Sequence, residues 1–361
     1  MADDAVVATP LPADPVRADV VVVGLGASGL EAIVLLAEAG LDVVGLDANG
    51  IAGGAAGANG GFLLAGLPDF HHEAVGRHGR PAANSWWHRT VEELDRLEED
   101  EPSFQRVGSL RIGADEDEER DCLIHLAQMK RDGIDALAYD GPEGRGLLVP
   151  GDGMFHPGQR CQRLASRALD AGARLHAPAP VQSVDTGRTR VASPDGGTRE
   201  VRSRVVLVAV DGGLEHVVPE VASTVRTARL QMLATAPLPP PTVPRPVYRR
   251  FGLDWFQQRR TGEVLLGGGR DVGGDEEWDA PAEPSEAVQS HLDRLLGELG
   301  LDWAAVTHRW AARAAFTTTR LPIDAQPRPR VHVVGGYSGH GNVIGSLLAR
   351  QAARRILAST Q

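Results

Sequence analysis

The 361-residue sequence is poor in cysteine, lysine and positive charge. Its two cysteines, Cys122 and Cys161, are too few for a disulfide framework and lack metal-site spacing, so we expect a reducing, cytoplasmic setting. Lys130 is the only lysine among 37 basic residues, which leaves almost no lysine for site chemistry. The net charge of −11 argues against nucleic acid or an anionic membrane as the main partner. We expect no metal site, because the adjacent His71 and His72 are poor ligands as well.

Long uninterrupted apolar runs are also missing. The first four residues carry acid where a secretory signal carries base. Residues 18–46 are apolar on average, but glycines and acidic residues break them into strand, turn, helix and strand rather than a membrane span. Hydrophobic residues make up 42% and charged residues 24%, a balance typical of folded domains, and the length suggests about two of them.

The first part of the chain predicts a compact βαβ unit. We expect residues 1–17 to form a loose leader, followed by a buried strand over 19–23 and a helix over 28–39 that Gly40 stops. A second strand follows over 41–46. The glycine-rich residues 50–61 follow this unit too closely for a flexible linker.

Further elements are predicted more coarsely, and no internal repeat is visible. The acidic run 115–121 indicates a solvated helix start or loop, and the proline-rich residues 237–246 favour a connection between domains over a recognition motif. Helices are expected over 83–101, 160–171, 285–299 and 342–357, and strands over 107–112, 174–184, 189–192, 198–201, 205–210, 247–250, 264–266 and 331–334.

The most informative motif is the G-x-G-x-x-G pattern that follows the first strand. Gly24 permits a tight turn, Gly26 lets the backbone approach a pyrophosphate, and Gly29 lets helix and strand pack closely. The helix start at Ala27 and Ser28 directs free N–H groups toward phosphates. Asp47 stands about 20 residues on, where an acid receives ribose hydroxyls. The pattern therefore predicts a bound dinucleotide.

The motif alone does not distinguish FAD from NAD. An NAD enzyme usually continues with further βαβ units, whereas here a glycine-rich stretch follows and strands of period two dominate the middle. A second glycine-rich strand-to-helix junction lies near the C-terminus. These features favour FAD, and an NAD-dependent dehydrogenase stays as the alternative.

Five patches resemble the D-amino-acid-oxidase-type family of FAD-dependent oxidoreductases. They are the fingerprint above, the G-A-A-G-A-N-G-G-F of 54–62, the G-S-L of 108–110 with the H-P-G of 156–158, the strand 205–213, and T-T-T-R-L-P of 317–322 with G-G-Y-S-G-H-G-N of 335–342. The last patch is similar to the γ-glutamylputrescine oxidase branch, whose members oxidise amines.

The resemblance implies an α/β fold in which a Rossmann-like FAD-binding domain carries an inserted antiparallel-sheet α+β substrate domain. The FAD-binding domain would comprise 18–72, 146–225 and 323–361, and the substrate domain 73–145 and 226–322. It implies FAD contacts at Gly24, Gly26, Ala27, Ser28, Gly29, Asp47, Ala48, Asn59, Gly60, Gly61, Phe62, Val181, Gly336, Gly339, His340, Gly341 and Asn342.

The sequence departs from the branch at several positions. Ala56 and Ala58 replace the usual Ser and Arg of the flavin segment, and Thr319 replaces a frequent Asn. No His or Cys occupies residues 45–61, so we expect FAD to be bound without a covalent link. The chain is also shorter than expected, which suggests a trimmed substrate domain.

The reaction that the resemblance implies is oxidation of the C–N bond of an amine or amino acid to an imine, with hydride transfer to flavin N5. A helix opening at 339–341 would stabilise negative charge on the ring. The electron acceptor would be O₂ or another molecule. Lys130, expected on an exposed helix, would not assist the reaction of the reduced flavin with oxygen. A non-catalytic FAD-binding protein is a further alternative.

Four residues are candidates for the chemistry, each with a structural alternative. Arg320 could bind a substrate carboxylate or pair with Asp324. Tyr337 could line the flavin or pack, and His340 could donate to the flavin or cap the turn. Tyr248, with Trp255 and Phe256 nearby, could enclose an ammonium group or belong to the core.

Overall fold

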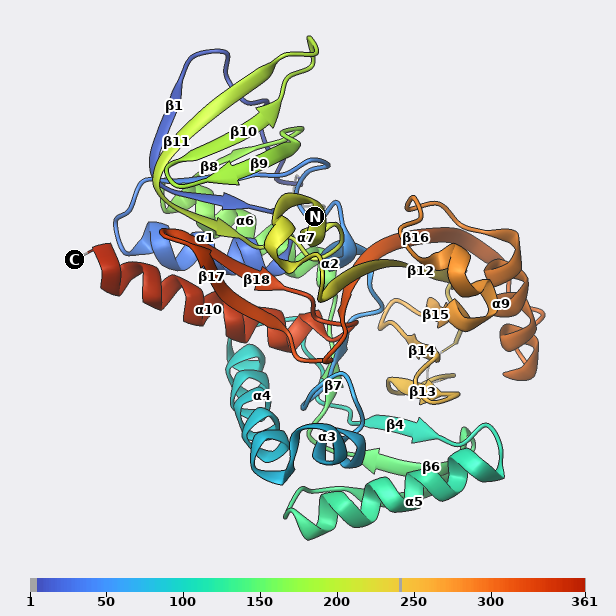
Figure 1. Ribbon diagram of the computed structural model, residues 1–361. Coiled ribbons are helices and arrows are strands. Elements are labelled where there is room, and N and C mark those ends of the chain that lie inside the picture. The colour runs from blue at the N-terminus through green and yellow to red at the C-terminus, as the bar shows by residue number, and fades with distance from the viewer. Residues whose placement is uncertain (1–4, 240–241, 361) are drawn as a thin grey trace. The chain divides into compact units, whose positions relative to one another are not determined.

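The computed structural model describes residues 5–239 and 242–360, which form two compact units (Figure 1). Unit 1 comprises Met1–Ala58, Pro157–Thr227 and Ala314–Gln361, and unit 2 comprises Asn59–His156 and Ala228–Arg313. The boundaries expected from the sequence fall 2 to 14 residues from these, and two strands each run through a boundary. These strands are β12 (Val225–Thr235) and β16 (Val306–Thr317).

Unit 1 is built on an eight-stranded sheet. The path β17–β18–β11–β1–β2–β8 is parallel from β18 to β8, and β17 joins it antiparallel. A hairpin of β9 and β10 extends from β11. The strands are β1 (Val16–Val23), β2 (Val43–Leu46), β8 (Arg174–His176), β9 (Val181–Asp185), β10 (Arg188–Ala192), β11 (Thr198–Val208), β17 (Ile323–Arg328) and β18 (Val331–Gly335).

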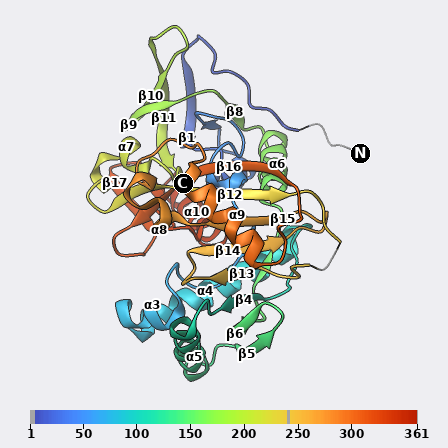
Figure 2. The same ribbon diagram turned by 90° about the vertical axis from the view of Figure 1, so that its right-hand side faces the viewer.

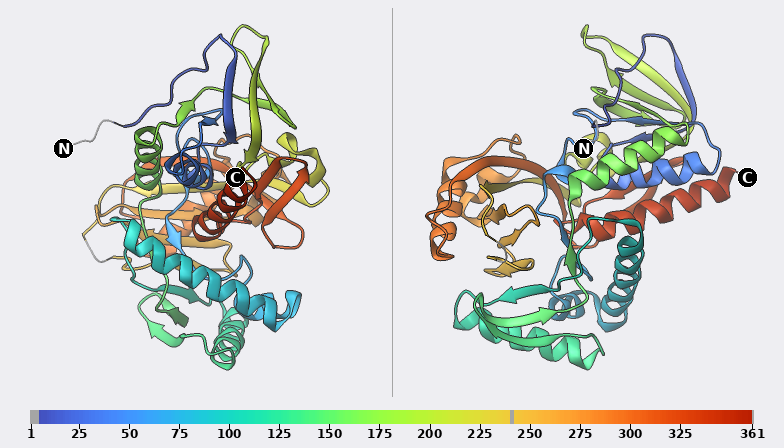
Figure 3. Two further views of the ribbon diagram at one scale, coloured as in Figure 1. Left: turned by 90° about the vertical axis from the view of Figure 1, so that its left-hand side faces the viewer. Right: turned by 180° about the vertical axis from the view of Figure 1, so that it is seen from behind.

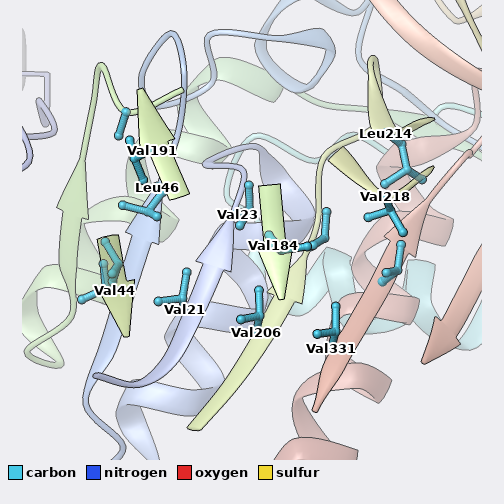
Figure 4. Close-up of a cluster of buried hydrophobic side chains, with 14 of the residues drawn as sticks. Val21, Val23, Val44, Leu46, Val184, Val191, Val206, Leu214, Val218 and Val331 are labelled. Carbon is cyan, nitrogen blue, oxygen red and sulfur yellow. The ribbon is translucent and has the colours of Figure 1, made fainter. Parts of the chain in front are cut away.

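Three helices lie side by side on one face of this sheet: α1 (Ala27–Glu38), α6 (Pro157–Asp170) and α10 (Gly341–Thr360) (Figure 3). The β9–β10 hairpin covers the other face, where Val21 and Val23 of β1 pack with Val184 and Val191 (Figure 4). Both faces are therefore buried, which explains why the valines of β1 form an unbroken run rather than an alternating pattern. The short helices α2 (Ala55–Ala58), α7 (Leu214–Val217) and η1 (Pro219–Val221) complete the unit.

Two local expectations for unit 1 need correction. The strands expected over 198–201 and 205–210 are the single strand β11. Part of the expected loose leader packs on the unit: the Thr9 N–H donates to the Leu175 carbonyl over 3.0 Å, and Leu11 is buried in the core. Residues 1–4 lie outside the described residues.

Unit 2 contains a second, largely antiparallel sheet in the order β16–β12–β15–β14–β13–β4–β6–β5 (Figure 2). Strands β13 and β4 run parallel, whereas the β12–β15, β15–β14, β14–β13, β4–β6 and β6–β5 pairs are antiparallel. The strands are β4 (Ser109–Ile112), β5 (Leu137–Gly141), β6 (Gly144–Val149), β13 (Val247–Arg249), β14 (Asp254–Gln258) and β15 (Val264–Gly268), and β3 (Phe62–Leu63) pairs separately with β7 (Gly153–Met154).

Helices cover the two faces of this sheet differently. Helix α9 (Glu286–Glu298) packs through Val288, Leu292 and their neighbours against one face. Helix α5 (Glu116–Arg131) packs on the other face at the β4–β6 end, and Asp115 caps it by accepting from the Glu118 N–H over 2.9 Å. The acidic run is thus a helix start. Helices α3 (His71–His78), α4 (Arg80–Asp100), α8 (Arg270–Gly273) and η2 (Gly274–Glu277) also belong to unit 2.

The proline-rich residues 237–246 do not connect domains, because they link β12 to β13 within unit 2; residues 240–241 lie outside the described residues. Among the described residues, no helix combines the length and apolarity needed to cross a bilayer.

Asp152 is a buried carboxyl that holds three segments of unit 2 together. It accepts from the Ala65 N–H over 2.9 Å and the Ser109 hydroxyl over 2.6 Å, and its carbonyl accepts from the Gly108 N–H. Burial raises the pKa of Asp152 to about 7, against the opposing effect of these hydrogen bonds. The folded state therefore binds a proton that the unfolded state releases near pH 4.

This pKa predicts a pH-dependent loss of stability. Between pH 4 and pH 7 the folded state holds more protons, so the contribution of Asp152 to the free energy of unfolding falls as the pH rises. An Asp152→Asn variant does not titrate; its Oδ1 can accept from the Ala65 N–H, and its Nδ2 can donate to the Ser109 hydroxyl, reversing that bond. We expect the stability of the wild type relative to this variant to fall by on the order of 4 kcal/mol across that range, measured by urea denaturation. Parallel pH profiles for the two proteins would contradict the prediction.

Candidate dinucleotide site

The glycine turn of unit 1 has the geometry that its sequence predicts. Gly24 adopts φ +108°, and a side chain there would meet the Ala209 carbonyl oxygen at 2.8 Å. A Cβ at Gly29 would lie 1.9 Å from the Gly24 carbonyl oxygen. Both glycines are thus required for the turn between β1 and α1 to close.

The N-terminus of α1 presents backbone amides to the space beside this turn. Gly26 occupies the N-cap position, no side chain caps the helix, and the first intrahelical bond runs from the Leu30 N–H to the Gly26 carbonyl. The amides of Ala27, Ser28 and Gly29 therefore have no acceptor within the helix. Such a helix start attracts phosphate.

Asp47 ties the end of β2 to the glycine turn. Its carboxylate accepts from the Leu25 N–H over 2.8 Å and from the N–H groups of Asn49 and Gly50 over 2.7 and 2.9 Å. These three bonds orient the Asp47 carboxylate. Its oxygens have lone pairs that can still accept hydrogen bonds from further donors. Ala48 follows in the same exposed loop.

The second glycine-rich helix opening, at the start of α10, lies against the first. The Tyr337 phenol donates to the Ser28 hydroxyl over 3.0 Å, and a Cβ at Gly345 would lie 2.5 Å from the Ser28 Oγ. Tyr337 is buried, and burial raises the pKa of its phenol. This geometry favours the packing role that the sequence left open for Tyr337.

Asp211 is the residue of this region that the sequence reasoning missed. It follows β11, and its carboxylate accepts from the backbone N–H groups of Tyr337 and Ala315 over 3.1 and 3.0 Å. Burial raises the pKa of Asp211 to about 6, against these bonds. An acid placed directly after the apolar run 205–210 was the available sequence signal. Asp211 fixes the turn that leads into α10.

Arg320 and His340 occupy two turns of unit 1. Arg320 adopts φ +63° after β16, with its Cζ 5.8 Å from the centre of the Phe316 ring. Asp324, the alternative partner considered for Arg320, pairs with Arg355. His340 is half-buried, and its backbone N–H donates to the Tyr337 carbonyl over 3.0 Å.

The flavin segment implied by the resemblance crosses the boundary between the units. Its last four residues belong to unit 2, where the Asn59 Oδ1 accepts from the Gly61 N–H over 2.8 Å and the Gly61 carbonyl accepts from the Phe155 N–H over 3.0 Å. Gln257 Nε2 donates to the Gly60 carbonyl. This part of the segment is therefore held by one internal hydrogen bond and by two bonds from other segments of unit 2.

Tyr248 and Trp255 lie on the face of the unit 2 sheet against which this segment packs. The Tyr248 ring meets the Phe62 ring edge to face, with centroids 5.2 Å apart. Phe256 does not join them, because it packs in the core beneath α9. Lys130 is exposed on α5, although that helix also has a buried face that includes Cys122 and Met129.

The expected site residues are thus distributed over both units. Tyr248, Asn59, Gly60, Gly61 and Phe62 lie in unit 2. Unit 1 holds Gly24, Gly26, Ala27, Ser28, Gly29, Asp47, Ala48, Val181 on β9, Arg320, Gly336, Tyr337, Gly339, His340, Gly341 and Asn342.

The residues of unit 1 fit a dinucleotide. No side chain caps the start of α1, and Gly26 has no side chain; a Cβ at Gly26 would lie 3.2 Å from the Ala56 Cβ. Phosphates can therefore approach the backbone at this turn. Asp47 stands beside the same turn, where a ribose would reach it.

The chain is similar in sequence to known oxidoreductases and in fold to solved structures. The chain is 28% identical to "Probable oxidoreductase OrdL" of Rhizobium meliloti, covering 93% of this chain and 83% of that protein. It is 25% identical to "Gamma-glutamylputrescine oxidoreductase" of Escherichia coli, covering 94% and 84%. Its fold matches glycine oxidase from Geobacillus kaustophilus with a TM-score of 0.78, at 16% identity over 95% of both chains.

A second solved structure, L-proline dehydrogenase from P. horikoshii, matches with a TM-score of 0.75 at 17% identity, over 96% of this chain and 95% of that one. The family described as "DAO: FAD dependent oxidoreductase" matches residues 19–355. This match removes the NAD-dependent alternative, and FAD is the cofactor. The chain therefore belongs to the DAO family of FAD-dependent oxidoreductases.

Proposed function

We propose that this oxidoreductase converts the C–N bond of an amine or amino acid into an imine. The substrate carbon loses a hydride while the nitrogen lone pair forms the C=N bond. The resulting iminium ion releases its N–H proton to give the imine, which water hydrolyses to a carbonyl compound and an amine or ammonia. Bound FAD supplies the hydride acceptor, at N5. The observation that carries the proposal is the junction of two glycine-rich helix openings in unit 1, joined by the Tyr337–Ser28 hydrogen bond, in a member of this family.

The two units would divide the work. Unit 1 is proposed as the FAD-binding domain, in which the start of α10 stabilises negative charge that develops on the cofactor. Unit 2 is proposed as the substrate domain, whose sheet carries Tyr248. Arg320 and His340, on two turns of unit 1, are proposed to bind the substrate and the cofactor, because the half-buried side chains remain partly accessible.

The test is anaerobic reduction of the bound flavin by a panel of polyamines, N-methyl amino acids and D-amino acids. We expect the purified protein to carry FAD and at least one compound to bleach its absorbance near 450 nm. Bleaching by none of them would support a non-catalytic FAD-binding protein instead. Admitting air to the reduced protein then separates the two kinds of enzyme: fast reoxidation would indicate an oxidase that uses O₂, and very slow reoxidation a dehydrogenase that uses another acceptor.

A further inference from the structure

The face of the unit 2 sheet that lies opposite α9 carries one row of residues in register. Val247, Phe256 and Leu266 point into the core beneath α9, so their neighbours along each strand point the other way. Residues directly opposite each other on adjacent strands share a face. The register places Arg111, Tyr248, Trp255, Gly267 and Met232 in one row across β4, β13, β14, β15 and β12.

Trp255 lies flat at the centre of this row. A Cβ at Gly267 would lie 2.6 Å from the indole Nε1 and Cε2, so the ring covers the glycine backbone directly. Trp255 is half-buried and packs against the buried cluster of Met232, Ala234 and Leu265. The indole therefore lies against the Gly267 backbone, while the side chain stays partly exposed.

The flavin segment lies against the same face. Gly60 accepts from Gln257, which stands two residues beyond Trp255 on β14, and a Cβ at Gly60 would be 3.4 Å from the Met232 methyl group. Phe62 contacts Tyr248. All of these residues belong to unit 2, so the neighbourhood is defined within one compact body.

The charge on this row is already neutralised. The Arg111 Nη2 lies 2.5 Å from the Asp121 carboxylate, and its Cζ lies 3.5 Å from the centre of the Phe70 ring. The Arg111 side chain is only 4% exposed, so its charge is not presented to a ligand. What the row presents is aromatic surface, and the faces of Trp and Tyr rings attract organic cations rather than carboxylates.

We propose that Trp255 binds the non-reacting, positively charged end of the substrate, which makes the substrate an amine with a second ammonium group. This inference rests on the proposed function. The reacting nitrogen needs its lone pair to form the C=N bond, whereas a ring face stabilises the protonated form. The ammonium group on Trp255 is therefore the second one, and Trp255 determines specificity without entering the reaction.

Three matched amines test the proposal by anaerobic stopped-flow reduction of the bound flavin. They are 1,4-diaminobutane, pentylamine and 5-aminopentanoate, which place an ammonium, a methyl or a carboxylate at the same end of the chain. We expect the diamine to show the lowest Kd and the carboxylate the highest. The Trp255→Leu variant should raise the Kd of the diamine about 3- to 30-fold, with the rate of reduction at saturation unchanged.

Two further variants separate binding from folding. Trp255→Phe keeps an aromatic face and should recover part of the preference for the diamine over pentylamine. Trp303→Leu removes a tryptophan of unit 2 that is 65% exposed, and should leave all three Kd values unchanged. FAD content and circular dichroism are compared for every variant.

The outcomes distinguish the inference from the proposed function. Pentylamine or 5-aminopentanoate binding as tightly as the diamine, or an equal loss for all three in Trp255→Leu, would overturn the inference while leaving amine oxidation intact. So would reduction by an amino acid but by none of these three amines. Failure of every amine and amino acid to reduce the flavin would overturn the proposed function and, with it, the inference.

Discussion

A Gly29→Ala variant is expected to be purified with less than about a tenth of the FAD that the wild type carries. The added methyl group would lie 1.9 Å from the Gly24 carbonyl oxygen, a contact that no rotation relieves because backbone blocks it. The glycine turn or α1 must shift, and either shift moves the amides that receive the phosphates. FAD released by heating and quantified by fluorescence measures the loss.

The matched control is Gly76→Ala. Gly76 lies within helix α3, and a Cβ there would meet no atom within 4 Å. Alanine in a helix interior stabilises by up to about 1 kcal/mol relative to glycine, so this variant should keep its FAD and have an equal or slightly higher Tm. A Gly29→Ala protein with full FAD content and an unchanged Tm would refute the account of the turn.

The second large effect is expected at a buried ion pair that joins the helices of unit 1. The Arg160 Nη2 of α6 lies 2.6 Å from the Glu31 carboxylate of α1 and donates to the Ser346 hydroxyl of α10 over 3.1 Å. Both charged side chains are less than a tenth exposed. Arg160→Met would remove the 2.6 Å partner of the buried Glu31 carboxylate, whose contact with Arg350 is longer, at 3.4 Å. We expect a loss of about 3–5 kcal/mol in the free energy of unfolding, measured in urea.

A second pair between the same two helices provides the comparison. Arg167 of α6 and Glu38 of α1 lie 2.9 Å apart, but both side chains are about half exposed. Arg167→Met should cost less than about 1 kcal/mol, because water screens the pair. The Glu31→Leu/Arg160→Met double variant should regain more than half of the loss, since the buried Glu31 charge is removed together with that of Arg160. Equal costs for Arg160→Met and Arg167→Met would contradict this explanation.

The parts of the fold that could be predicted from the sequence are those that local residues determine. The turn between β1 and α1 depends on glycines within six positions, and Asp47 bonds back to Leu25 in that same unit of chain. The helices α6, α9 and α10 carry periodic apolar faces. These patterns can be predicted without knowing which distant segments the residues contact.

The parts that could not be predicted depend on distant contacts. Asp211 bonds to Ala315 and Tyr337, more than a hundred positions away, and the sequence gives no spacing rule for such a pair. Trp255 and Phe256 are adjacent aromatic residues, and the sequence does not distinguish which of them lies in the site. The pairing of β14 with β13 and β15 determines that Phe256 faces α9. A continuous strand such as β16 likewise hides the boundary between units.

Each unit contains one buried thiol whose labelling would report the local unfolding of that unit. Cys161 lies in unit 1 and Cys122 in unit 2; both are buried, and neither forms a disulfide. Burial also raises the pKa of Cys122 to about 11, so in the native protein almost none of it is thiolate at neutral pH. A thiol reagent can therefore label either residue only after the surrounding unit opens. Peptide mapping of the labelled protein over time would give the opening rates of both units from the natural chain, without an engineered probe.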